Sequence, residues 1–172
     1  LGAVVAIFLQ LNLGHGWWVP VFAFGGALFA SWLAYTLSTR SGRTDTATLL
    51  LAGVAISSLF GAVISLLYHF VEDGILRQIV YWLMGNLTGK RWEHLTLASP
   101  FVLVGTVGLM LLANELNIVS GGEDDARSLG VGVERVKRAT LVCVSLSTGA
   151  AISITGMIGF VGLIVPHTLR LL

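Results

Sequence analysis

The sequence predicts an all-α, polytopic membrane helical bundle, and its composition is the first reason. Hydrophobic residues make up 55% of the 172 residues and charged residues only 11%, with a mean hydropathy of +0.87. Soluble domains carry about 25% charged residues, so this chain has too little charge for a surface that faces water. The charged residues are also clustered, which leaves long uncharged runs between them. The composition therefore predicts that the chain is a piece of an integral membrane protein.

The uncharged runs are long enough to cross a membrane as helices. A spanning helix needs about 20 apolar residues, whereas strands of a membrane barrel would show alternating segments of about ten. A helix also satisfies its backbone polar groups within one segment. We therefore predict spans over 17–39, 47–69, 95–114 and 135–155, the start of another over 158–172 after a glycine-rich turn, and the tail of an earlier span over 1–13.

The distribution of Lys and Arg predicts which loops face the cytoplasm. Alternation of the spans puts seven of these residues on one side: Arg40, Arg43, Arg127, Arg135, Lys137, Arg138 and Arg170. Three fall on the other side: Arg77, Lys90 and Arg91. Because cytoplasmic loops carry the excess of positive charge, we expect the 115–138 loop in the cytoplasm and the 70–94 loop outside.

Several classes of protein and site are disfavoured by the same residues. A net charge of +1 gives no argument for a nucleic-acid partner. A single cysteine, Cys143, excludes an internal disulfide framework and a cysteine-based zinc site, and no cofactor or metal is predicted. No charge lies in the middle of a predicted span, whereas ion-coupled carriers and pumps usually need one there. An ion-coupled secondary transporter of a small solute therefore stands as the alternative function, with a purely structural membrane scaffold as a third reading.

Small residues recur every four positions in two of the spans. Gly53, Ser57, Gly61 and Ser65 form one such stripe, and Ser145, Gly149 and Ser153 form the other. Small side chains let a second backbone approach closely. Ordinary helix packing and a face that lines a passage both fit this spacing, and the sequence leaves the two open.

Two shorter segments between the spans have helical features. In the 72–93 loop, apolar residues from Ile75 to Leu87 follow helical spacing and predict an amphipathic helix in or near the outer interface. In the 115–138 loop, three acids follow Gly122 and suit a helix start, and Gly130 suits a left-handed cap. So short a helix is unstable alone in water. It either packs under the membrane domain or is presented to a partner's groove.

Four stretches, in this order, resemble the signature regions of FecCD-type permeases: LLLAGVAISSLFGAVISLL, IVYWLMGNL, GEDDARSLGVGVERVKR and ITGMIGFVGLIVPHTLRLL. Such permeases are membrane subunits of ABC importers for ferric siderophores, haem and cobalamin. The resemblance covers essentially the whole chain. It implies a multi-pass protein of the bacterial plasma (inner) membrane with ten membrane helices, of which this chain would be the middle, from the end of the third helix into the eighth.

The resemblance also implies roles for three sets of residues. The helix over 123–130 would be the coupling helix that docks on an ATPase subunit, through Glu123, Asp125, Ala126, Arg127, Leu129 and Gly130. The helix from Ala47 would line the translocation path at a dimer axis, through Thr46, Thr48, Leu49, Gly53, Ser57 and Gly61. A structural turn would be formed by Gly156, Phe160, Gly162, Pro166 and His167.

The implied partners follow from the same resemblance. They are a second permease copy, two cytoplasmic ATP-binding subunits, an extracytoplasmic substrate-binding protein and the lipid membrane. ATP hydrolysis would reside in the partner subunits, so the chain is not expected to be an enzyme. An iron-siderophore complex is the expected substrate because it is the commonest one in the family.

Overall fold

The computed structural model describes residues 1–11, 17–40, 42–88, 90–159, 164–165 and 167–169. Within them the chain is built of α-helices and one short β-hairpin. In chain order the elements are α1 (Gly2–Phe8), α2 (Trp18–Ser38), β1 (Thr39–Arg40), β2 (Arg43–Thr44), α3 (Thr46–Leu67), α4 (Asp73–Leu83), α5 (Trp92–Leu111), α6 (Ala113–Gly121), α7 (Glu123–Ser128) and α8 (Val133–Thr155).

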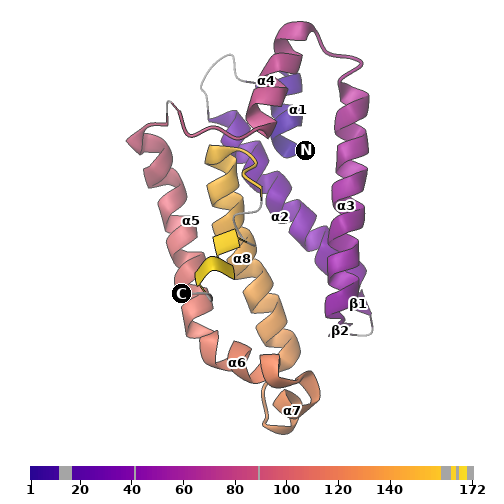
Figure 1. Ribbon diagram of the computed structural model, residues 1–172, viewed down its shortest axis with the longest axis vertical. Helices are drawn as coiled ribbons and strands as arrows, with labels where there is room; N and C mark the ends of the chain where they lie inside the picture. The colour runs from indigo at the N-terminus through magenta and orange to yellow at the C-terminus, as the bar shows by residue number, and fades with distance from the viewer. Residues whose placement is uncertain (12–16, 41, 89, 160–163, 166, 170–172) are drawn as a thin grey trace.

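Four long helices form the body of the molecule. Helices α5 and α8 pack side by side, α2 crosses against α8, and α3 packs on the far side of α2 (Figure 1). The β-hairpin, α6 and α7 gather at one end, here called the hairpin end, and α1 and α4 lie at the other, the α4 end (Figure 1). The segments that alternation of the spans assigns to one side, 40–45 and 112–132, therefore lie at the same end.

The predicted fold class, an all-α polytopic bundle, is confirmed. In the described part of the chain, α2, α3, α5 and α8 are long and apolar enough to cross a membrane. In the most apolar 18-residue stretch of each helix, at most 17% of the residues are buried within the chain. Large apolar side chains such as Trp32, Leu50 and Leu103 are more than half exposed. So large an apolar surface requires lipid or further protein to cover it.

The predicted amphipathic helix of the 72–93 loop is α4, and its apolar face is covered by protein. Ile79 is fully buried in a cluster with Val4 and Ile7 of α1 and with Val19 of α2. Burial of such a side chain contributes roughly 1.5–3 kcal/mol. Contact with α1 therefore fixes α4 at the end of the bundle, and the helix ends at Leu83, earlier than the apolar spacing predicts.

Glycines set how closely the long helices approach one another. On α5, a Cβ atom at Gly105 would meet Ser147 and Cys143 of α8, and one at Gly108 would meet the Cys143 sulfur. On α8, a Cβ atom at Gly149 would lie 3.3 Å from the Cβ atom of Ala27 on α2. The stripe that contains Gly149 is therefore a packing surface, as close backbone approach requires.

Two elements at the hairpin end differ from the sequence-based expectation. Residues 115–121, expected to be loop, are part of helix α6, which follows α5 after a break at Leu112. The 39–44 segment, for which no structure is expected, is a hairpin in which Thr39 pairs with Thr44 and Arg40 with Arg43. Gly42 has φ +77°, a conformation that glycine adopts without steric cost.

Candidate functional site

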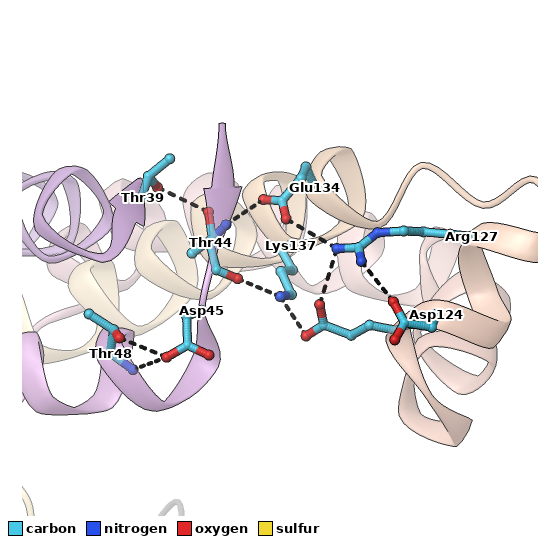
Figure 2. A network of polar contacts seen from close by, with 9 residues as sticks. Thr39, Thr44, Asp45, Thr48, Asp124, Arg127, Glu134 and Lys137 are labelled. Atoms are coloured by element: carbon cyan, nitrogen blue, oxygen red, sulfur yellow. Dashed lines mark hydrogen bonds and ion pairs between the residues drawn. The ribbon is translucent and has the colours of Figure 1, made fainter. Parts of the chain in front are cut away.

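A network of polar contacts at the hairpin end joins β2, α7 and α8 (Figure 2). At its centre is Thr44, which is 3% exposed. Its backbone N–H donates to Oε2 of Glu134 at 3.0 Å, and its backbone oxygen accepts from Nζ of Lys137 at 2.6 Å. Its hydroxyl lies 3.0 Å from the hydroxyl of Thr39. Both backbone polar groups of this buried residue are therefore satisfied by side chains of α8.

The same network contains the ion pairs of the short helix α7. Nζ of Lys137 lies 2.6 Å from Oε1 of Glu123, and the Lys137 side chain is 16% exposed. Arg127 contacts Glu123 at 3.4 Å and Asp124 at 3.0 Å, and it lies 3.8 Å from Glu134. A charge that is largely withdrawn from water must be paired. The ammonium group of Lys137, on α8, is paired with Glu123 of α7, so the ion pair joins two different helices.

The hairpin leads directly into the start of α3. Asp45 is the N-cap residue of that helix, and its Oδ2 accepts from the hydroxyl of Thr48 at 2.7 Å and from the Thr48 backbone N–H at 2.8 Å. These two hydrogen bonds hold the pKa of Asp45 below its ordinary value, and the bond from the Thr48 hydroxyl has the larger effect. The charged carboxylate is thus the favoured form at the helix N-terminus, where negative charge is stabilising.

The six residues expected to couple to an ATPase fall into two groups. Leu129 is 73% exposed, and Asp125 and Gly130 are exposed beside it. Gly130, with φ +83°, follows the end of the helix, where a glycine is favoured.

The other three coupling candidates face into the chain. Ala126 is fully buried, and α7 packs against α6 and α8. Glu123 pairs with Arg127 and Lys137 within the polar network, and Figure 2 shows Arg127 pointing into that network. The side chain of Ala126 is therefore not available to a partner, and we do not carry it forward as a contact.

The pathway candidates lie along α3 in two different settings. Thr46 and Leu49 line a cavity of about 430 Å³ at the hairpin end, together with Tyr35, Lys137 and Thr140 among others. Thr48, by contrast, closes the cap with Asp45. Farther along the helix, Ser57 and Gly61 are exposed, and a Cβ atom at Gly53 or Gly61 would meet no atom of the described residues within 4 Å. This stripe is open within the chain.

The glycine turn after α8 is described only in part. Gly156 ends the helix with φ +75°, and a Cβ atom there would collide with the backbone oxygen of Trp82. Close by, the backbone N–H of Asn86 donates to the backbone oxygen of Thr155 at 2.7 Å. The turn is therefore fastened to the chain that follows α4. His167 lies within the described residues, whereas Phe160, Gly162 and Pro166 lie outside them.

The sequence analysis missed the residues that hold the network together, namely Thr44, Asp124, Glu134 and Lys137. Two local signals were present. Asp45 precedes Thr48 by three residues, a spacing that suits an N-cap, and Glu134 and Lys137 are three residues apart, which places them on one helix face. As for metals, the described residues contain no group of three or more His, Cys, Asp or Glu side chains that could hold an ion.

Comparison with known proteins identifies the family of this chain. The profile of the FecCD transport family matches residues 1–172, the whole chain. The chain belongs to the FecCD transport family. Its similarity to individual members extends over nearly all of its length. It is 49% identical, over 99% of the chain, to the cobalamin import system permease protein BtuC of Halobacterium salinarum. It is 40% identical, over 87% of the chain, to the hemin transport system permease protein HmuU of Yersinia pestis.

A solved structure of a transporter has the same fold. It is described as an inward-facing conformation of an ABC transporter of metal-chelate type, and it superposes with a TM-score of 0.82 at 30% identity, over 99% of this chain and 54% of that one. The chain covers 46% of the Halobacterium permease and 44% of the Yersinia permease. It thus spans about half the length of the curated relatives that it matches.

Proposed function

We propose that this chain is part of the membrane-spanning permease subunit of an ATP-driven importer. Membership of the FecCD transport family over the whole chain carries this proposal. Four long apolar helices supply the membrane-spanning part: α2 and α3 contain no Asp, Glu, Lys or Arg, and in α5 and α8 such residues lie only within the first six positions. That distribution disfavours the ion-coupled alternative, which needs a titratable group within the membrane. ATP hydrolysis would take place in a partner subunit.

The hairpin end is the proposed cytoplasmic side, and α7 is the proposed contact for the ATPase. The loops at this end carry the excess of Lys and Arg, which the positive-inside rule assigns to the cytoplasm. Leu129 exposes most of its apolar surface there, next to the exposed acid Asp125. An apolar side chain presented by a short, fixed helix suits insertion into a groove of a partner.

Helix α3 is the proposed wall of the translocation path, facing a second copy of the permease. Its small-residue stripe, which includes Ser57 and Gly61, is uncovered in the chain. At its inner end, Thr46 and Leu49 border a cavity whose wall includes hydroxyl groups and one ammonium group. A smooth, partly hydroxylated helix face allows passage of a solute and close approach of a partner helix.

The proposed substrate is a bulky metal chelate supplied by an extracytoplasmic binding protein. The two relatives named above are permeases for cobalamin and hemin, and the solved structure is of metal-chelate type. Cobalamin and hemin are macrocyclic metal complexes, and the names of the relatives favour them over the iron-siderophore complex that the sequence analysis expects.

Reconstitution of the complete protein tests the proposal. The permease is purified together with its ATPase and binding protein, placed in liposomes, and assayed for uptake of labelled cobalamin, hemin and a ferric siderophore. We expect uptake that requires ATP hydrolysis and saturates for one of the chelates. Uptake driven by a proton or sodium gradient without ATP would instead establish a secondary transporter.

A further inference from the structure

The first turn of α8 connects two elements that are distant in the sequence. Glu134 and Lys137 lie on one face of α8 and bind the backbone N–H and oxygen of Thr44, at 3.0 and 2.6 Å. The same Lys137, shown beside Thr44 in Figure 2, pairs with Glu123 of α7 at 2.6 Å. Helix α8 packs against both α7 and β2. Lys137 is therefore shared between the short helix and the hairpin.

Lys137 differs from an ordinary surface ion pair. Its side chain is 16% exposed and its backbone partner Thr44 is 3% exposed. Exposed ion pairs contribute little, but loss of a charged donor leaves a buried acceptor unsatisfied, which is expensive. A cleft of about 530 Å³, bordered by Asp45 and Thr48 on one side and Glu123 on the other, lies beside this contact.

The chain continues from this contact straight into α3. Thr44 is followed by Asp45, the N-cap residue of α3, and by Thr46, which lines the cavity at the hairpin end. A group that fixes Thr44 therefore also fixes the start of α3. We propose that Lys137 is a positioning residue that transmits displacement of α7 to the start of α3, so that α7, the first turn of α8 and the hairpin move as one body. This inference rests on the proposed function, in which α7 contacts an ATPase and α3 lines the path.

Transport measured against ATP hydrolysis tests the inference in the complete, reconstituted importer. Lys137→Met removes both polar contacts and retains most of the length of the side chain. We expect normal ATPase association and hydrolysis but about a tenfold fall in substrate moved per ATP, equivalent to about 1.4 kcal/mol. Lys137→Arg, which keeps the charge and the donors, should restore most of the coupling. Arg135→Met is the matched control, because Arg135 is exposed two residues away and takes part in none of the ion pairs among the described residues.

A distance measurement tests the same contact without the ATPase. Spin labels at Arg43→Cys in the hairpin and Ser128→Cys in α7, with Cys143→Ala, report the separation of the two elements. We expect one narrow distance distribution with Lys137 present and a broad one in Lys137→Met. Should that variant fail to insert, Glu123→Gln weakens the ion pairs of Glu123 with Lys137 and Arg127, leaves the contact between Lys137 and Thr44 in place, and is expected to broaden the distribution in the same way.

Each result decides a separate point. Unchanged substrate per ATP in Lys137→Met, or an unchanged distance distribution, would overturn the transmission role. Loss of ATPase association in that variant would also overturn it, since Lys137 would then shape the docking surface instead. Failure of the proposed function would show in the wild-type protein, as absence of ATP-dependent uptake, while the spin-label distances would still report on the contact.

Discussion

Leu129→Glu is the substitution that most directly tests whether α7 docks on an ATPase. The side chain is 73% exposed, so the fold of the chain hardly depends on it. The end of α7 is held by backbone contacts: the Leu129 N–H donates to the Asp125 oxygen at 3.0 Å, and Gly130 takes the left-handed conformation that follows. Surface substitutions of this kind usually change stability by no more than about 0.5 kcal/mol. We therefore expect normal insertion and folding.

The expected loss of docking is much larger than this change in stability. Full burial of a leucine contributes roughly 1.5–3 kcal/mol, and with 73% of Leu129 still exposed a partner's groove could gain about 1–2 kcal/mol of this. The glutamate forgoes that gain and would place an unpaired charge in an apolar groove, at a further several kcal/mol. Because about 1.4 kcal/mol corresponds to a tenfold change in affinity, docking should weaken by a hundredfold or more.

Co-purification of the ATPase with the complete permease measures this loss. Leu129→Met keeps an apolar side chain and should retain the ATPase. Leu87→Glu makes the same change at a leucine that is 65% exposed beyond α4, on the proposed outer side, and it should also retain the ATPase. If Leu129→Glu purified with a full complement of ATPase and transported normally, α7 would be a structural element of its own domain, and the reasoning from its exposed leucine would be wrong.

Three further predictions address the stripe, the topology and the turn. Gly61→Leu has room within the chain, so it should fold but impair dimer cross-linking and uptake in the complete protein; normal assembly with normal uptake would show that nothing approaches this face. Ser128→Cys, with Cys143→Ala, should react with an impermeant maleimide only after cells are permeabilised, and labelling of intact cells would reverse the topology. Gly156→Ala, at φ +75° and against a backbone oxygen, should destabilise the protein by about 1–3 kcal/mol in thermal unfolding. Gly159→Ala, whose added Cβ atom would meet none of the described residues within 4 Å, should not, and equal effects would contradict the argument.

The long helices could be predicted because a membrane imposes a simple requirement on sequence. An uncharged run of about 20 residues has few alternatives to a spanning helix. The structure has α2 at Trp18–Ser38 and α3 at Thr46–Leu67, where the sequence predicts spans over 17–39 and 47–69. The short helix α7 was also foreseeable, since acids at its start and Gly130 after its end are local signals that need no tertiary contact.

The connections at the hairpin end were not foreseeable in the same way. Each strand of the hairpin is two residues long, too short for a pattern of alternation to appear. The partners of Thr44 lie far along the chain, in α8. From the sequence alone, a charged residue such as Lys137 is expected to lie in water at the end of a loop. The family resemblance therefore marked Glu123 and Arg127 as contacts for a partner, whereas in the structure they form ion pairs within the chain.

The two small-residue stripes show why tertiary structure is needed to interpret such a pattern. Both have the same spacing, and both permit a backbone to approach closely. On α8, a Cβ atom added at Gly149 would lie 3.3 Å from the Cβ atom of Ala27 and 3.4 Å from the ring of Phe24. That stripe is therefore already used for packing against α2. On α3, a Cβ atom added at Gly53 or Gly61 would meet nothing within 4 Å in the part of the chain that the structure describes. A smooth apolar face left open in a chain that spans about half the length of its relatives calls for a covering surface from elsewhere, and this open stripe is where we place the second copy and the path between the two.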